Sequence, residues 1–217
     1  MKYIDIINSN ETKRQMMAYV QQKLLPIDKL TKSGKYFEFR SRFGHTRRVL
    51  EWVNRINATE KGDEEILIVS AIFHDVGYFA TTEEHAVYSE LLFREYITSH
   101  CLYSGDPDLV EKIALTIASH SDKERSNNTL TKEQMILMDA DILDEIGAMQ
   151  VLWTCFLEAE NEHFDYESAY NHIRKSIEEN QEDFQLLHTE QGKRFAADMN
   201  EYNRNFIEGL KFELGLE

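Results

Sequence analysis

Apolar residues recur along most of the chain every three to four positions, the spacing that gathers side chains on one face of an α-helix. The two clearest series are Met16, Tyr19, Val20 and Leu24, which Pro26 is expected to end, and Val49, Trp52, Val53 and Ile56, which begin soon after His45. The chain has only two prolines and nine glycines. So few residues that interrupt helices favour an all-α protein with long elements over one built from short strands and tight turns.

The starts of further helices are indicated by residues whose side chains cap the first turn. On this basis we expect helices over 66–75 after Asp63 and before Gly77, over about 84–98, over 108–120 after Asp106 and Pro107, and from about 132 onward through Asp141. Thr131 and Gln134 have the spacing of a capping box for the last of these. About three more helices are expected after Met149, whereas residues 26–43 and 121–130 have no helical period and are predicted to be loops.

The charge composition limits the kinds of molecule that the chain is expected to bind. Aspartate and glutamate number 39 against 24 lysines and arginines, which gives a formal net charge of −15. Duplex nucleic acid is polyanionic, so broad binding to it is not expected, although an acidic surface is equally consistent with a role in solubility. Two short basic clusters, 40–42 and 47–48, are dense enough to serve one anionic small molecule.

The chain has no sequence feature of a secreted or membrane protein. Its first residues lack the apolar region of a signal peptide, and no apolar run approaches the ~20 residues of a membrane span. The two cysteines, Cys101 and Cys155, lie in apolar contexts expected to be helical and form no recognisable disulfide framework. These features predict a reducing, cytoplasmic environment.

Two ionisable residues, His74 and Asp75, stand at the end of the apolar run 66–73. Burying an unpaired charge costs several kcal/mol, so such a pair needs compensation in the folded protein. A divalent cation can supply it, because neutral imidazole and carboxylate are both ordinary ligands of first-row metal ions. Taken alone, however, a His-Asp dipeptide is more often an exposed helix end.

A second stretch also places carboxylates among apolar residues. Asp139 and Asp141 follow four apolar positions, and Asp141 has Asp144 and Glu145 three and four positions further on. Like charges at these spacings repel each other unless a positive charge lies between them. A solvated helix face explains Asp144 and Glu145 well but explains the two earlier aspartates poorly.

The order and contexts of these residues resemble the H…HD…D signature of the HD-domain superfamily of metal-dependent phosphohydrolases. The similar segments are Phe43-Gly44-His45-Thr46-Arg47, Ala71-Ile72-Phe73-His74-Asp75-Val76-Gly77 and Asp139-Ala140-Asp141-Ile142-Leu143-Asp144. The resemblance covers about residues 43–147, with a weaker continuation at 189–193. It is closest in kind to small stand-alone bacterial HD proteins, some of which hydrolyse nucleotides.

The resemblance implies a helical bundle that forms a single domain over residues 1–217, with the helices of 148–217 packed on the motif region. It also implies a divalent ion, one of Mn, Fe, Ni, Co, Zn or Mg, held by His45, His74, Asp75 and Asp141. Two further histidines, His85 and His120, lie where relatives with two metals complete a second site and where relatives with one metal line the substrate pocket. We favour the pocket role and leave ligation of a second ion, and a surface or capping role, as alternatives.

The implied reaction is metal-assisted hydrolysis of a phosphoester or phosphoanhydride in a nucleotide or another phosphorylated small molecule. The candidate catalytic residues are His85 and His120, which would contact phosphate or protonate the leaving group, and Asp144, which would orient a metal ligand. Arg42 and Arg48 are candidate substrate contacts, and Arg48 has a surface ion pair with Asp144 or another acid as an alternative.

One departure from the family leaves the general base open. Several HD relatives have an acidic residue about three positions after the His-Asp pair, whereas residues 77–80 here contain none. Glu83 and Glu84 lie at a different spacing. Two other functions therefore stay open: a metal-binding regulatory or sensor protein without turnover, and a di-iron oxygenase, which would need both His85 and His120 as ligands. The sequence does not predict an oligomeric state.

Overall fold

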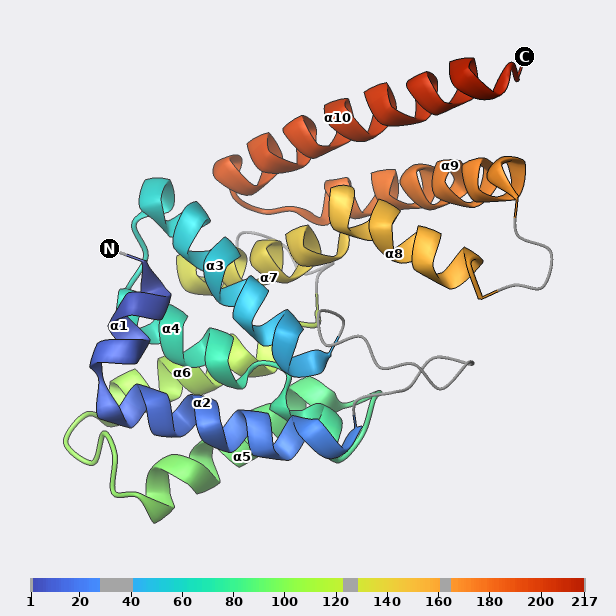
Figure 1. Cartoon of the computed structure of the whole chain (residues 1–217). Coiled ribbons are helices and arrows are strands. Elements are labelled where there is room, and N and C mark those ends of the chain that lie inside the picture. The colour runs from blue at the N-terminus through green and yellow to red at the C-terminus, as the bar shows by residue number, and fades with distance from the viewer. Residues whose placement is uncertain (1, 28–40, 123–128, 161–164, 217) are drawn as a thin grey trace.

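The computed structural model describes residues 2–27, 41–122, 129–160 and 165–216. Ten α-helices and no β-strand occur in these ranges, which confirms the predicted all-α fold. The helices are α1 (Tyr3–Ser9), α2 (Glu11–Leu24), α3 (Arg42–Glu60), α4 (Glu64–Phe73), α5 (His85–Ser99), α6 (Pro107–Ser119), α7 (Lys132–Glu145), α8 (Ala148–Glu158), α9 (Tyr166–Asp183) and α10 (Glu190–Leu214). Short 3-10 segments are η1 (Leu25–Ile27), η3 (Val76–Phe79) and η5 (Phe184–Leu186). Figure 1 shows α1–α7 gathered in one bundle, from which α8–α10 extend.

Helix α4 forms the centre of the main hydrophobic core. Every residue from Ile66 to Phe73 is buried, so this helix has no face in contact with solvent. It packs against α2, α3, α6 and α7. Each large apolar side chain buried there contributes about 1.5–3 kcal/mol relative to exposure. The central position of α4 means that the residues at its C-terminal end, His74 and Asp75, lie inside the bundle.

The predicted capping residues begin three of these helices. The carboxylates of Asp63 and Asp106 accept hydrogen bonds from main-chain N–H groups in the first turns of α4 and α6. Thr131 and Gln134 form the predicted capping box at the start of α7. Local side-chain chemistry therefore fixes where these helices begin.

Two predicted boundaries are wrong. Helix α4 ends at Phe73 rather than at residue 75, and Gly77 lies within η3 instead of ending the helix. An ideal Cβ at Gly77 would lie 2.0 Å from the carbonyl oxygen of His85, so glycine is needed there for a close approach of two backbones. Phe43, assigned to a loop, lies in the first turn of α3, which Ser41 caps by accepting a hydrogen bond from the N–H of Gly44.

Other parts of the predicted loops, residues 28–40 and 123–128, lie outside the described residues. Helix α1 was not predicted, because its seven residues bury only Tyr3 and Ile7, too few to show a period. Cys101 also differs from expectation: it is exposed and follows α5 in a turn with a φ of 53°. There the N–H of Leu102 donates to the carbonyl of Ile97, a bond that closes the helix end.

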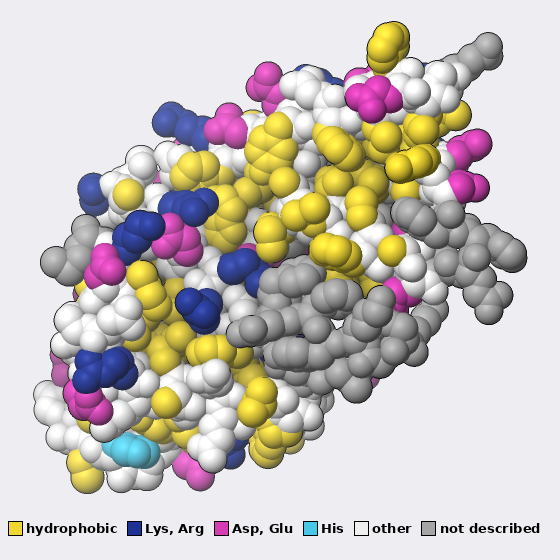
Figure 2. All heavy atoms as spheres, in the orientation of Figure 1, with side chains coloured by type: hydrophobic (Ala, Val, Ile, Leu, Met, Phe, Trp, Pro, Cys, Tyr) yellow, Lys and Arg dark blue, Asp and Glu magenta, His cyan; other side chains and the backbone are white. Residues whose placement is uncertain are grey.

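Three helices follow α7, beginning at Ala148 and so close to the expected start at Met149, and they share a smaller hydrophobic cluster of Val151, Ile173, Ile177 and Ile207. Helix α10 also contacts α3 and α7 of the bundle. The assignment of residues 1–217 to a single domain stays a prediction. Figure 2 shows hydrophobic side chains gathered on the surface over α8 and α10; exposed residues on these helices include Leu152, Phe156, Tyr202 and Phe206.

None of the described helices combines the length and the apolar character needed to cross a membrane. The free cysteines Cys101 and Cys155 lie in different parts of the fold, the first in the turn after α5 and the second in α8.

Candidate metal centre

Six ionisable residues, each within or directly after one of five helices, meet in the interior of the bundle. They are His45 in the first turn of α3, His74 and Asp75 directly after α4, His85 at the start of α5, His120 directly after α6, and Asp141 on α7. Helices α3 and α7 pack together, so His45 and Asp141 meet although they are 96 positions apart. The packing of the core helices therefore assembles this cluster.

His45, His74 and Asp141 form the first of two groups, which we term the His45 trio. Nε2 of His45 lies 3.0 Å from Oδ1 of Asp141 and 3.3 Å from Nε2 of His74. Nε2 of His74 lies 4.0 Å from the same carboxylate oxygen. All three residues are buried, and their nitrogen and oxygen atoms are close enough together to share one metal ion.

Asp75, His85 and His120 form the second group, the Asp75 trio. Nε2 of His85 lies 3.2 Å from Nε2 of His120, and Oδ1 of Asp75 lies 3.7 and 3.5 Å from these two nitrogens. Oδ2 of Asp75 lies 3.5 Å from Nε2 of His45. The carboxylate of Asp75 therefore lies between the two trios.

All four imidazole rings present the same nitrogen to the cluster. Nδ1 of His74, His85 and His120 lies within 3.1 Å of the carbonyl oxygens of Ala71, Thr82 and Ile117, and Nδ1 of His45 lies 2.7 Å from Oδ2 of Asp144. An acceptor at this position holds the proton on Nδ1 and leaves the Nε2 lone pair free. Rings held in this way are arranged as ligands to a metal ion.

The electrostatics of the cluster favour a positive charge among its carboxylates. Burial opposes a charge on His45, but its hydrogen bonds with Asp141 and Asp144 outweigh this and raise its pKa to about 10. For His74, burial prevails and lowers the pKa to about 4. Burial also opposes ionisation of Asp75, yet the surrounding imidazoles hold its pKa well below its usual range. The carboxylates of Asp75 and Asp144, whose pKa is also lowered, thus stay ionised, and either a proton on His45 or a bound cation compensates their charge.

Asp144 lies on the far side of the His45 ring from the cluster. Besides meeting Nδ1 of His45, its carboxylate accepts hydrogen bonds from Nε of Arg48 at 2.8 Å and from Nη2 at 2.9 Å. In the structure the Arg48 guanidinium therefore pairs with Asp144. The sequence had left this ion pair open as the alternative to a substrate contact by Arg48. The three residues form a chain from the edge of the protein to the His45 trio.

Arg42 lies at the edge of the cluster. Its Nη1 is 3.3 Å from Oδ2 of Asp75, and its guanidinium carbon lies 3.8 Å from the ring centre of Tyr78. Tyr78 in turn stacks on His85 with ring centres 4.0 Å apart. The sequence did not single out Tyr78, because neither contact has a local pattern. Arg40, from the same basic cluster as Arg42, lies outside the described residues.

Asp139, the other buried aspartate of its motif, does not join the trios. Its carboxylate accepts hydrogen bonds from the main-chain N–H groups of His188 and Thr189 and from the Thr189 hydroxyl, at 2.6–2.8 Å. These donors lie at the start of α10. Burial outweighs the hydrogen bonds and raises the pKa of Asp139 to about 6. The hydrogen bonds of Asp139 thus attach the start of α10 to α7.

No replacement for the acid that some relatives have after the His-Asp pair is evident among the described side chains of this turn. Glu83 and Glu84 are both exposed at the start of α5. Residues 77–80 belong to η3 and its C-cap. The identity of the general base therefore stays open.

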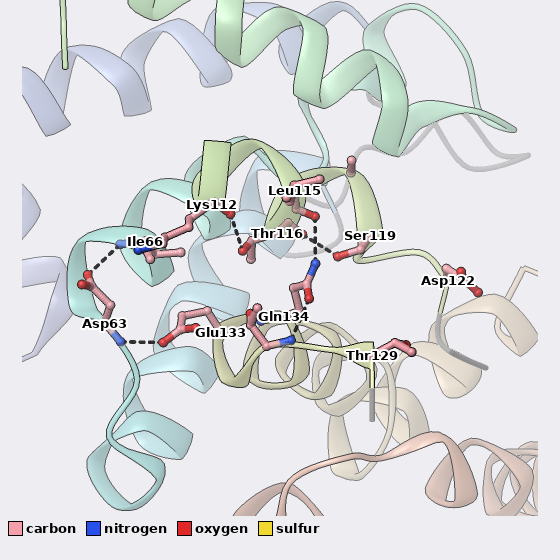
Figure 3. A pocket seen from close by; sticks show the side chains of 12 residues that line it. Asp63, Ile66, Lys112, Leu115, Thr116, Ser119, Asp122, Thr129, Glu133 and Gln134 are labelled. Carbon is pink, nitrogen blue, oxygen red and sulfur yellow. Dashed lines mark hydrogen bonds between the residues drawn. The ribbon is translucent and has the colours of Figure 1, made fainter. Parts of the chain in front are cut away.

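A cavity of about 620 Å³ lies apart from the two trios, between the start of α4, α6 and the start of α7 (Figure 3). Lys112, Thr116, Ser119 and Gln134 are among the residues that line it, and the residues of the trios are not. The Thr116 hydroxyl donates to the carbonyl of Lys112, and the Gln134 amide donates to that of Leu115. Much of the polar lining is therefore already satisfied within the protein.

Solved structures share the fold of this chain. A predicted HD superfamily hydrolase from an uncultured Thermotogales bacterium is 20% identical, with a TM-score of 0.65 over 93% of this chain and 92% of that chain. Lin1889 from Listeria innocua is 21% identical, with a TM-score of 0.58 over 100% and 99%. Bacillus subtilis YpgQ in complex with ADP is 19% identical, with a TM-score of 0.59 over 98% and 97%. At these identities the likeness concerns the fold.

Comparison with curated proteins found no match. The family model of the HD domain matches residues 42–146. This range begins with α3, ends directly after α7 and includes all six residues of the two trios. The order of the motifs, the helical fold and the family model agree that residues 42–146 form an HD domain.

Proposed function

We propose that this protein is a metal-dependent phosphohydrolase that acts on a nucleotide or another phosphorylated small molecule. The proposal rests mainly on the buried convergence of four imidazoles and two carboxylates, in which each ring offers Nε2 to the cluster while Nδ1 meets an acceptor. Imidazole and carboxylate together form a common ligand set for first-row divalent ions. Metal-dependent hydrolysis is the chemistry for which such a ligand set in an HD domain is best suited.

We assign two ions to the cluster. One would be held by the His45 trio together with Asp75, and the second by the Asp75 trio. Asp75 would serve both, since Oδ2 faces His45 while Oδ1 faces His85 and His120. Bound divalent ions lower the pKa of a coordinated water from ~15.7 toward ~7 and polarise phosphoryl oxygens.

The geometry favours His85 and His120 as metal ligands over the phosphate-contact role expected first from the sequence. Their Nε2 atoms lie 3.2 Å apart and both face Oδ1 of Asp75. Two neutral imidazoles with lone pairs directed at each other repel unless a cation or a proton lies between them. A second ion would provide that positive charge.

A phosphorylated substrate is supported by the position of Arg42. Its side chain is 37% exposed, and its guanidinium reaches Asp75 at the edge of the cluster. A guanidinium so placed can pair with a phosphate while it stays in contact with the cluster. Bacillus subtilis YpgQ was crystallised with ADP, which makes nucleotides the first class to test.

The proposal is tested by metal analysis of the purified protein, followed by a panel of nucleotides and phosphoesters assayed with the metal found. His74→Ala and Asp75→Ala should each abolish metal-stimulated release of phosphate or pyrophosphate, because each removes a ligand from a buried site. His172→Ala is the matched control, since His172 is an exposed histidine on α9 that pairs with Glu158. Full activity in either cluster variant would contradict the proposal.

The same experiment separates the alternatives. Tight metal binding without hydrolysis across the panel would favour a regulatory or sensor role. The di-iron oxygenase alternative gains support from the presence of both His85 and His120 in the cluster, so metal stoichiometry alone does not exclude it. Consumption of oxygen by the iron-loaded protein, without release of phosphate, would favour that alternative.

A further inference from the structure

Tyr78 is the first residue of interest beyond the ligands, because its ring lies against one of them. The ring stacks on His85 with an interplanar angle of 19° and ring centres 4.0 Å apart. The Arg42 guanidinium carbon lies 3.8 Å from the centre of the same tyrosine ring. Two groups this close to the ring centre cannot share one face, so Arg42 and His85 lie on opposite faces of Tyr78.

The backbone around Tyr78 is held closely to the helix that carries His85. The N–H of Gly77 donates to the Ser89 hydroxyl at 2.8 Å. An ideal Cβ at Gly77 would lie 2.0 Å from the His85 carbonyl oxygen and 2.6 Å from the Ser89 nitrogen. Only glycine allows this approach of η3 to α5, and the approach brings the Tyr78 ring over His85.

Among the four histidines of the cluster, His85 has the most exposed side chain. The exposed fraction of its side chain is 12%, against 0% for His74 and 1% for His120. It is the first residue of α5, where less of the helix surrounds it, and its Nδ1 lies 3.1 Å from the Thr82 carbonyl, longer than the corresponding contacts of His74 and His120. Because the His85 ring is less enclosed by the protein than the other rings, its orientation depends more on a neighbouring side chain.

We propose that Tyr78 is a positioning residue that fixes the His85 ring, with Nε2 directed at His120 and Asp75, and so completes the site of the second ion. Arg42 holds the opposite face of Tyr78 and keeps the tyrosine in place. This inference rests on the proposed two-ion site and adds to it a residue outside the ligand set. The orientation of His85 depends on the stacked ring of Tyr78, so the Tyr78 hydroxyl is not required.

The test is a titration with Mn²⁺, followed by calorimetry and by the electron paramagnetic resonance signal of the free ion, on the wild-type chain, Tyr78→Phe and Tyr78→Ala. Loss of a group that orients a metal ligand weakens metal binding about 10–100-fold. Tyr78→Ala should therefore bind the second Mn²⁺ at least about 10-fold more weakly and the first with unchanged affinity. Tyr78→Phe keeps the stacked ring and should bind both ions as the wild type does. Tyr88→Ala, which removes an exposed tyrosine from α5, the helix that carries His85, is the control.

Either of two results with the Tyr78 variants would overturn the inference. One is unchanged binding of both ions by Tyr78→Ala, and the other is equal weakening in Tyr78→Phe and Tyr78→Ala, which would assign the effect to the hydroxyl. A wild-type chain that binds one ion would also overturn it, while metal-dependent hydrolysis could still stand. Wild-type protein that binds two ions and hydrolyses no phosphorylated substrate would instead contradict the proposed function alone.

Discussion

His45 differs from the other histidines of the cluster in the acceptor that its Nδ1 meets. Its Nε2 faces Asp141 and His74, while its Nδ1 meets Asp144 rather than a main-chain carbonyl. Asp144 is in turn fixed by Arg48. A carboxylate behind a metal-binding imidazole orients the ring and increases its basicity. We therefore propose that Asp144, three positions after Asp141, acts on the site through His45.

Asp144→Ala tests this chain of contacts. Removal of the carboxylate leaves Nδ1 of His45 and the Arg48 head group without this acceptor, so the affinity for the first ion should fall about 10–100-fold. Competition with a chelator measures that affinity. Asp144→Asn keeps an oxygen that can accept from Nδ1 and should lose less. If Asp144→Ala binds the first ion as tightly as the wild type, Asp144 has no orienting role.

Among the helices, those with a strong local signature could be predicted from the sequence. Asp63, Asp106 and Thr131 each cap a helix through atoms two or three residues away, so the capping contacts are visible in the sequence itself. His74 and Asp75 could be singled out for a similar reason, because they follow the run 66–73, in which every residue except Ser70 is apolar. Both predictions depend on neighbours along the chain.

What the sequence could not decide depends on contacts between helices. The role of His85 was ambiguous because His120 lies 35 positions away and meets it only after α5 packs against α6. The apolar context alone did not separate Asp139 from Asp141, the ligand that the resemblance implied, and only the position of α10 reveals that the Asp139 carboxylate meets Thr189. Residues with the same local pattern thus acquire different functions from their distant partners.

Helix α10 is attached to α7 where Gly192 lies against Asp139. An ideal Cβ at Gly192 would lie 2.3 Å from Oδ2 of Asp139, a carboxylate that its hydrogen bonds to Thr189 and His188 keep from moving. Gly192→Ala should therefore destabilise the protein by about 1–3 kcal/mol, the usual cost of overpacking. Urea unfolding measures the change in the free energy of unfolding.

Gly209→Ala is the matched control on the same helix. Nothing lies within 4 Å of a Cβ built at Gly209, so the substitution should stabilise α10 by about 0.5–1 kcal/mol through helix propensity. A Gly192→Ala variant as stable as Gly209→Ala would show that α10 is not fastened at Asp139.

At the scale of the whole molecule, burial is unevenly distributed. The main core extends over α1–α7 and part of α10, whereas four buried residues form the second cluster among α8, α9 and α10. The proposed ions would connect α3, α4, α5, α6 and α7 at their meeting point. The bundle and the C-terminal helices should therefore differ both in local stability and in their response to metal.

Native-state hydrogen exchange tests this difference. Amides of α4, in which eight consecutive residues are buried, should exchange most slowly, and those of α8 and α9 faster. Addition of Mn²⁺ to metal-depleted protein should slow exchange in α3–α7, because a ligand that binds only the folded site stabilises the elements that form it. Exchange in α8 and α9 should change little. The His74→Ala variant, which lacks one proposed ligand, should lose most of the response.

The opposite outcome would be equally informative about domain organisation. If α8 and α9 are protected as strongly as α4 and respond to Mn²⁺ to the same extent, their opening requires unfolding of the bundle, and residues 1–217 behave as one cooperative unit. The contacts that would transmit such coupling run through α10, which packs on α3 and α7 and is fastened at Asp139. Gly192→Ala should then release α8 and α9 from the bundle and restore faster exchange there, while α4 keeps its protection.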